Sequence, residues 1–437
     1  MKLLFIAPSA YLLGGVQDWL YMTVTGLRLR GHKVMVGMPD NHFHNIKRYN
    51  SYYDEIHGIP FRNLSGTSEG RIRALSKFIQ LNKADVIVGV NIGDLYEAFK
   101  RVAHKLSNTK LVLTLHAIEA NYFLDLKEYL TEIDAVITTN RLTERLVQNM
   151  IPEYIGRIFY APYGIICPNT NLPDRNIQNS SLRIAWVGRV ENSQKRVCDL
   201  PDILIELDRL NIDYKLSIAG DGPCLTRLKE TLGGWEKQGK VVFWGFIKRE
   251  SMQVFYRHND ILLITSEWET GPIVAWEAME AGLAVVSSKY TGYLSEQSLI
   301  NNKTALLFEI GNYLEAAMQI ARLSDRFLHE EIAVQGRMMV LSKYSESRSV
   351  IAWEEAFEKT MKLETKTRIP PQVKSPRKPA GKLEKVFGVS LSERLRHLSP
   401  FRRYVLDAGG EWPHSKQGQT NQTFLLTYAN QLENSQI

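Results

Sequence analysis

The sequence contains few cysteines and no long hydrophobic run. Cys167, Cys198 and Cys224 are odd in number, lie far apart and lack metal-ligand spacing, so no disulfide framework and no cysteine-based metal site is indicated. No apolar run is long enough to span a bilayer. The start, "MKLLFIAPSAYLLGG", could serve as a secretion signal, but we expect a first buried strand and its turn. These absences favour a reduced, cytoplasmic protein.

Acidic residues are scarce in one segment. Residues 362–403 hold twelve Lys or Arg against three Glu, a balance of +9, whereas residues 404–437 carry −2. Because the whole chain carries +7, the first 361 residues have no net charge. The pI of 9.0 therefore belongs to the tail, and it does not indicate a nucleic-acid-binding fold.

Short apolar runs alternate with segments of helical period along most of the 437 residues. Such near-continuous strands between helices predict parallel sheets covered on both faces. A break rich in Pro, Asn and Ser at 162–181 separates two series of strands. The expected strands are 2–8, 33–39, 84–90, 110–116 and 134–140, then 182–190, 213–223, 241–246, 260–266, 283–288 and 304–309.

This alternation of strands and helices predicts an α/β fold class. Because a chain of this length exceeds what one core usually supports, more than one domain is expected. We expect one domain at 1–165, a second at 182–344, a C-terminal helix at 345–361 and a basic, partly disordered tail at 362–437.

The tail has two features of its own. The Pro- and Lys-rich run "TKTRIPPQVKSPRKPAGK" is typical of disorder. The stretch "LSERLRHLSPFRRYVL" fits a short basic amphipathic helix. It is either a solvated element or an attachment to anionic lipid, since clustered Lys and Arg are attracted to such surfaces.

The segment "ETGPIVAWEAMEAG" places Glu269 and Glu277 eight positions apart. Glu277 falls in a helix that is apolar on nearly every side, and a buried carboxylate needs donors or must be protonated. A structural partner such as Arg is one explanation. A ligand with adjacent hydroxyls, such as ribose, is the other.

The turn before this helix favours an anion. Gly271 permits close approach of a ligand, and the Pro that follows it fits the first turn of a helix. The free N–H groups of Ile273 and Val274 would then face an anion together with the helix dipole. Glu269 would lie beside that anion and face whatever the phosphate carries. The segment as a whole predicts a nucleotide-sugar site.

At this point the sequence resembles a known family. "SEWETGPIVAWEAMEAGLAVVSS" is similar to the E-x7-E segment of retaining glycosyltransferases with the GT-B fold, most closely glycosyltransferase family four. "GGVQDWL", "VLTLH", "WVGRVENSQKR", "IAGDGP" and "VVFWGF" resemble further signatures in the same order. The resemblance implies two Rossmann-like parallel-sheet domains facing each other across a cleft. The second domain would hold most of the donor and the first the acceptor, with the helix at 345–361 returning to the first domain.

The resemblance also implies roles for single residues. Arg189 and Lys195 would grip the donor diphosphate, where fixed cations stabilise the charge that develops as the sugar leaves. Glu277 would bind the ribose and Glu269 the sugar hydroxyls. His116 ends a strand, where open α/β sheets place ligands, and it would contact the transferred sugar without acting as a base.

Glycines complete the expected donor site. Gly14 and Gly15 would let a loop of the first domain approach the diphosphate. The backbone around Gly245 and Phe246 would meet the nucleotide base. The "AGDGP" glycines are expected to shape a turn rather than to touch the ligand.

The sequence has no two Asp residues two positions apart, so the Asp-x-Asp metal clamp of the other major glycosyltransferase fold is absent. We therefore predict a retaining transfer without cofactor or metal, from a UDP- or GDP-linked sugar to a glycan or lipid-linked acceptor. No nucleic acid is expected as a partner. The protein would be cytoplasmic, peripheral on the inner face of an anionic membrane if residues 362–403 attach there. A nucleotide-sugar epimerase and a non-catalytic binding protein are the alternatives.

Overall fold

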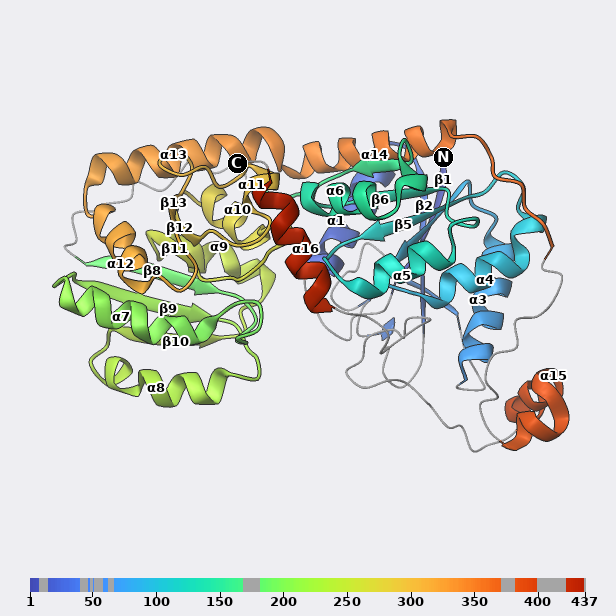
Figure 1. Ribbon diagram of the computed structural model, residues 1–437, viewed down its shortest axis with the longest axis horizontal. Coiled ribbons are helices and arrows are strands. Elements are labelled where there is room, and N and C mark those ends of the chain that lie inside the picture. The colour runs from blue at the N-terminus through green and yellow to red at the C-terminus, as the bar shows by residue number, and fades with distance from the viewer. Residues whose placement is uncertain are drawn as a thin grey trace. The chain divides into compact units, whose positions relative to one another are not determined.

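A computed structural model describes residues 1–7, 15–39, 46–47, 50, 58–61, 67–167, 181–370, 382–398 and 422–435. The chain divides into two compact units (Figure 1). Unit 1 comprises Met1–Thr139, Thr143–Ala161 and Val350–Leu425, and unit 2 comprises Asn140–Leu142, Pro162–Ser349 and Leu426–Ile437.

Unit 1 is built on a seven-stranded sheet in the order β3-β2-β1-β4-β5-β6-β7, in which every neighbouring pair is parallel. Strands β4 and β5 are buried along their whole length because helices cover both faces. The strands are β1 (Lys2–Ile6), β2 (Lys33–Pro39), β3 (Gly58–Phe61), β4 (Val86–Val90), β5 (Lys110–Leu115), β6 (Ala135–Thr138) and β7 (Ile158–Tyr160). The strands β3 and β7 were not expected from the sequence, since both are short and lie at the sheet edges.

The helices before the second unit are α1 (Gly15–Leu29), α3 (Ser68–Asn82), α4 (Asp94–Val102), α5 (Ala120–Glu128) and α6 (Arg141–Met150). Helix α14 (Glu346–Lys362) packs in unit 1 from Val350 onward. Its Trp353 ring lies 4.6 Å from the Trp19 ring, and Glu354 pairs with Arg30 and His32 at 2.5 and 2.6 Å. An apolar and a charged contact therefore both fix this helix.

The expected disorder of the tail does not hold for residues 363–370, which lie against unit 1. Arg368 pairs with Asp134 at 2.5 Å and also donates to the carbonyls of Thr131 and Glu132. Both members of the ion pair are buried. The remainder of the run, residues 371–381, lies outside the described residues. Beyond it follow the helices α15 (Lys382–Leu398) and α16 (Gln422–Asn434).

Unit 2 contains a six-stranded parallel sheet in the order β10-β9-β8-β11-β12-β13. All six strands expected after the break are present, so the α/β fold class is confirmed. They are β8 (Leu182–Val187), β9 (Tyr214–Ala219), β10 (Val241–Gly245), β11 (Ile261–Ile264), β12 (Ala284–Ser288) and β13 (Leu306–Phe308). The helices are α7 (Leu200–Arg209), α8 (Leu225–Lys237), α9 (Arg249–Arg257), α10 (Ile273–Glu280), α11 (Tyr293–Glu296), α12 (Tyr313–Arg322) and α13 (Arg326–Lys343).

Burial in unit 2 is complete at the centre of the sheet and incomplete at one edge. Strands β11 and β12 are buried throughout. The edge strand β10 exposes Val242 and Trp244, and Phe246 follows as a third exposed side chain. The pairing of β10 with β9 is interrupted between Phe243 and Gly245. No helix in the described part of the chain is both long and apolar enough to cross a bilayer.

Candidate functional site

The candidate site lies where the strand order of unit 2 reverses. Strand β8 pairs with β9 on one side and with β11 on the other. The chain leaves β8 into one crossover and reaches β11 through another, so the loops after these two strands diverge. Open α/β sheets bind ligands in the crevice at such a point. The loops at 188–196 and 265–272 both start there.

An ion pair joins these two loops. The Lys195 ammonium lies 2.6 Å from Oε1 of Glu269, and Ser266 Oγ donates to the same oxygen at 2.6 Å. Gln194 Nε2 donates to the Trp268 carbonyl at 3.1 Å. Glu269 is buried and Lys195 keeps 17% of its side chain exposed. The structure thus brings together two predicted site residues that are 74 positions apart.

Glu191 folds the loop that presents Lys195. Its buried carboxylate accepts the N–H groups of Ser193, Gln194 and Lys195 at 2.7, 3.1 and 3.0 Å. Burial alone would raise the pKa of Glu191, but these hydrogen bonds and that of the Ser193 hydroxyl outweigh it and lower the pKa. Sequence reasoning missed this residue. An acid followed by Asn and Ser just after a strand is the local signal that could have found it.

Arg189 does not accompany Lys195. Its side chain is exposed, and among the described residues it has no ion-pair partner. Of the two cations expected to bind the diphosphate, Lys195 is held in place by an ion pair and Arg189 is exposed to solvent.

The turn at Gly271 has the geometry expected for the start of the helix. Gly271 has φ +104°, a conformation that L side chains rarely adopt, and the rings of Tyr163 and Trp276 lie around the place where its side chain would be. Helix α10 begins at Ile273, whose N–H donates to the Gly271 carbonyl at 2.9 Å. The N–H of Val274 has no partner among the described residues. One of the two expected amides is therefore open to an anion, and the other is already bonded.

Glu277 is only partly buried, which corrects the expectation of a helix buried on nearly every side. Trp276 points inward and stacks on Tyr344 at 3.9 Å, whereas Glu277 reaches the surface. Its Oε2 accepts a hydrogen bond from the Tyr256 hydroxyl at 3.0 Å. A phenol is thus one of the structural partners of Glu277. Burial and the nearby carboxylate raise the pKa of Tyr256 well above its usual value, so this hydroxyl stays protonated and can donate.

The ends of β9 and β10 complete the wall of the site. A Cβ at Gly220 would lie 1.9 Å from the Gly188 carbonyl oxygen, so only glycine fits beneath the loop after β8. The Gly220 N–H donates to the Gly245 carbonyl at 2.8 Å, and Phe246 beside it is exposed. This arrangement agrees with a turn-shaping role for the "AGDGP" glycines.

Two further predicted site residues belong to unit 1. His116 follows β5 and is buried, with Nε2 2.9 Å from Thr114 Oγ1 and its ring 4.4 Å from that of Trp19. Burial lowers the pKa of His116 to about 3, so its imidazole is neutral at physiological pH. Gly15 is the first residue of α1. Gly14 lies outside the described residues.

Sequence reasoning also missed Glu433, near the end of α16. Its carboxylate accepts the N–H groups of Gly292 and Ser295, the latter at 2.8 Å. Gly292 adjoins the candidate site because the preceding residue, Thr291, accepts the Glu269 N–H at 3.1 Å. No composition signal pointed to this acid, since it stands in a segment expected to be a solvated tail.

Among the described residues, no group of three or more His, Cys, Asp or Glu side chains gathers as it would around a metal ion. The loops after β8 and β11 and the start of α10 carry the Lys195 ammonium, the Glu269 and Glu277 carboxylates, the Ser266 hydroxyl and the Val274 amide. Such a set can neutralise an anion with the cation and amide, and it can accept hydrogen bonds from hydroxyls with the carboxylates.

Comparison with known proteins points to one family. The model of Glycosyl transferases group 1 matches residues 170–338. The alpha-monoglucosyldiacylglycerol synthase of Streptococcus pneumoniae is 25% identical over 47% of this chain and 49% of its own length. The N-acetyl-alpha-D-glucosaminyl L-malate synthase of Bacillus anthracis is 25% identical over 37% of this chain and 42% of its own length. The match thus spans less than half the length of each relative.

Solved structures extend the likeness over most of the chain. Anabaena HepE, in a complex with UDP and glucose, has a TM-score of 0.66 at 18% identity and covers 82% of this chain and 99% of its own. The sucrose-phosphate synthase of Thermosynechococcus elongatus has a TM-score of 0.65 at 16% identity, with 82% and 98% covered. These identities show the fold, and the expected GT-B architecture of two Rossmann-like domains is confirmed.

Assignment to family four stays a prediction. The part of the chain that matches the family model includes the loop after β8, the Lys195–Glu269 ion pair and the turn at Gly271. Residues 170–338 thus match the model of glycosyl transferases group 1, and the candidate site lies within this match.

Proposed function

We propose that this protein is a retaining glycosyltransferase that moves a sugar from a UDP- or GDP-linked donor to a glycan or a lipid-linked acceptor, without a metal ion. The observation that carries the proposal is the Lys195 ammonium, fixed by Glu269 at the strand-order reversal beside the Gly271 turn. A cation fixed by Glu269 and an open amide that follows Glu269 closely in the chain suit a diphosphate. The match of residues 170–338 to the model of glycosyl transferases group 1 supports sugar transfer as the reaction.

In the proposed reaction the donor diphosphate lies between Lys195 and the Val274 N–H. The bond between the anomeric carbon and the phosphate oxygen breaks, and the charge that gathers on the leaving diphosphate is stabilised by the fixed ammonium. Arg189, whose side chain is exposed, closes over the diphosphate from the solvent side. Because Glu191 and Glu269 hold Lys195 from opposite ends of its chain, little reorganisation is needed when that charge develops.

The carboxylates and the acceptor complete the scheme. Glu269 accepts hydrogen bonds from the sugar hydroxyls, and Glu277, oriented by Tyr256, accepts from the ribose. The acceptor oxygen attacks the anomeric carbon from the face that the diphosphate leaves, and its proton passes to the departing phosphate oxygen. Configuration is retained in this scheme. A neutral His116 serves as a hydrogen-bonding contact for the sugar rather than as a base.

We further propose that the protein works in the cytoplasm, peripheral to an anionic membrane. Cys167, Cys198 and Cys224 are all free thiols, which suits a reducing compartment. The name of the Streptococcus relative denotes synthesis of a diacylglycerol glycolipid, which favours a lipid-linked acceptor for this chain too. The basic segment 362–403 would supply the attraction to the membrane.

A nucleotide-binding panel followed by one substitution tests the proposal. Thermal shifts with UDP, GDP and ADP, with and without EDTA, identify the donor base, and we expect the shift to survive chelation. Donor turnover with Lys195→Ala should then fall by about 10²–10³ while nucleotide affinity falls far less, since the ammonium acts mostly on the transition state. Lys215→Ala, at an exposed lysine of β9, is the matched control.

Three outcomes would contradict the proposal. Equal losses of turnover and affinity in Lys195→Ala would favour a binding protein. A changed sugar on the nucleotide without any acceptor would favour an epimerase. A thermal shift that disappears with EDTA would refute the metal-free site.

A further inference from the structure

Helix α15 is folded with its polar side inward. The polar side chains of Glu384, Ser392 and Glu393 are buried. Val386 and Leu398 expose 73% and 82% of their surface. The other exposed apolar side chains of this helix are Leu383, Phe387, Leu391 and Leu395. This pattern is the reverse of that of a helix packed on a protein core.

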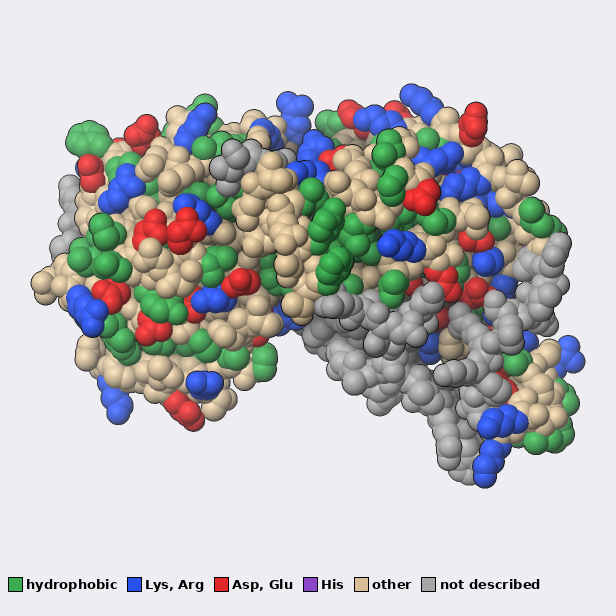
Figure 2. Space-filling view, viewed as in Figure 1, with side chains coloured by type: hydrophobic (Ala, Val, Ile, Leu, Met, Phe, Trp, Pro, Cys, Tyr) green, Lys and Arg blue, Asp and Glu red, His purple; other side chains and the backbone are tan. Residues whose placement is uncertain are grey.

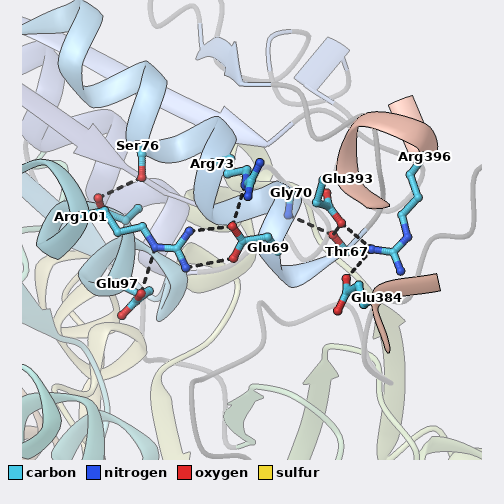
Figure 3. Close-up of polar contacts among 11 residues, drawn as sticks. Thr67, Glu69, Gly70, Arg73, Ser76, Glu97, Arg101, Glu384, Glu393 and Arg396 are labelled. Atoms are coloured by element: carbon cyan, nitrogen blue, oxygen red, sulfur yellow. Dashed lines mark hydrogen bonds and ion pairs between the residues drawn. The ribbon is translucent and has the colours of Figure 1, made fainter. Parts of the chain in front are cut away.

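A polar network explains why the acids face inward. The Arg396 guanidinium pairs with both Glu384 and Glu393, the latter at 2.6 Å. Thr67, at the start of α3, donates from its hydroxyl to Glu393 at 2.7 Å (Figure 3). The same threonine accepts the Gly70 N–H and so caps α3. Among the described residues, the Thr67–Glu393 hydrogen bond links α15 to α3, whereas the ion pairs of Arg396 join the two acids within α15.

The exposed apolar side chains form two groups, one on each side of the interruption at Gly388. Leu391, Leu395 and Leu398 are spaced four and three positions apart, which aligns them along one side of a helix. Leu383, Val386 and Phe387 have the equivalent spacing before Gly388, where the helical backbone is interrupted. Figure 2 shows hydrophobic and basic side chains next to each other on the exposed surface of α15.

The charges on the exposed side all have one sign. Lys382, Lys385 and Arg394 are exposed, and among the described residues they have no ion-pair partner. Both acids of α15 are turned inward, where they share Arg396 as a partner. An apolar strip bordered only by cations complements a surface that combines acyl chains with negative headgroups. A partner protein would not require the exclusion of every acid from this face.

We propose that this apolar and cationic face of α15 lies in the headgroup region of an anionic lipid bilayer and attaches unit 1 to it. The inference rests on the membrane association proposed above, names the face responsible, and does not depend on the sugar-transfer reaction. The basic residues that flank the helix in the chain add to the attraction without determining which face is buried.

The test is flotation of the full chain with vesicles of phosphatidylcholine alone and of phosphatidylcholine mixed with phosphatidylglycerol. We expect binding to the mixed vesicles only, weakening as salt is raised. The double variants Leu391→Ser/Leu395→Ser and Lys385→Glu/Arg394→Glu should each lower the bound fraction at least about tenfold.

Matched controls change the same residue types elsewhere. Leu29→Ser/Phe327→Ser removes two side chains that are 86% and 85% exposed outside α15. Lys303→Glu/Lys343→Glu alters the net charge of the protein by the same amount as the α15 charge variant, at exposed positions of unit 2. We expect both controls to bind vesicles as the unaltered chain does. The nucleotide thermal shift of every variant should also be unchanged, which separates this inference from the proposed transfer reaction.

Three results would overturn the inference. The first is no binding of the unaltered chain to anionic vesicles at physiological salt. The second is an equal loss of binding in the controls. The third is a change of oligomeric mass in the α15 variants with vesicle binding intact, because the face would then be covered by a second copy of the chain. Since the apolar and the charge variants act independently, misfolding of one leaves the other to decide.

Discussion

The ion pair between Arg368 and Asp134 offers a stability prediction that can be worked out from the structure. The guanidinium is 5% exposed and the carboxylate is fully buried. In Arg368→Ala, the carboxylate would keep the Leu111 N–H, at 2.7 Å, as its one donor among the described residues. Breaking a buried pair by removing one partner costs about 3–5 kcal/mol, because an uncompensated charge stays inside. We expect a loss of this size in the free energy of unfolding of unit 1.

The assay must resolve the two units, since a chain of two units need not unfold in one step. Hydrogen exchange followed by mass spectrometry does so, with peptides from β5 and β6 reporting on unit 1 and peptides from β11 and β12 serving as the internal reference. The predicted loss corresponds to exchange roughly 10² to several 10³ times faster in the unit 1 peptides. Adding Asp134→Asn should recover part of it, because the buried charge is then removed.

The control is Arg326→Ala, which breaks an ion pair with Glu330 whose side chains are 62% and 50% exposed. Exposed pairs contribute about 0–1 kcal/mol, so exchange should change little. If Arg368→Ala altered unit 1 no more than this control alters its own unit, residues 363–370 would not rest on unit 1 in solution and the reasoning would be refuted.

Three further predictions concern the candidate site. His116, whose pKa is lowered to about 3, binds a proton in the unfolded chain below about pH 6.5 but not in the folded one, so the free energy of unfolding should fall by about 2 kcal/mol between pH 7 and pH 5; urea titrations of His116→Phe should lack this fall, and an equal fall would contradict the assignment. Glu191→Gln should weaken nucleotide binding about tenfold by calorimetry, since charge-assisted hydrogen bonds to the loop of Lys195 are lost; unchanged affinity would count against its positioning role. Gly220→Ala should cost about 3 kcal/mol or more by forcing the Gly188 backbone to move, whereas Gly233→Ala, in open space on α8, should be neutral or stabilising in the same melts.

Much of the fold could be predicted because each strand or helix is recognisable from its own short stretch of sequence. Strands such as 110–115 and 284–288 are buried on both faces and appear as largely apolar runs, bounded by helical segments. The same pattern fails at the margins. The three-residue strand β7 is half-exposed at its positions and gives no run to recognise.

The site was predictable only in part, because its contacts join distant positions. The residue types at Lys195 and Glu269 suggested anion and hydroxyl binding, but their direct ion pair depends on which strands become neighbours in the sheet. The Ile273 N–H was expected to be open, and the tight turn at Gly271 uses it internally. Arg368 stands in a run whose composition favoured disorder, and Glu433 stands in the tail beyond it. Both are held by specific contacts with residues far away in the chain.

The free edge of β10 has a consequence for handling the protein. An edge strand that is paired on one side only and shows Val242 and Trp244 to water is a template on which another strand can add. The irregular pairing at Phe243 and Gly245 bends this edge, and the exposed Lys248 follows it closely in the chain; both features oppose such addition. Substitutions that straighten the edge or remove this lysine should therefore cause the protein to polymerise on concentration, even where every hydrogen bond of the candidate site is left intact.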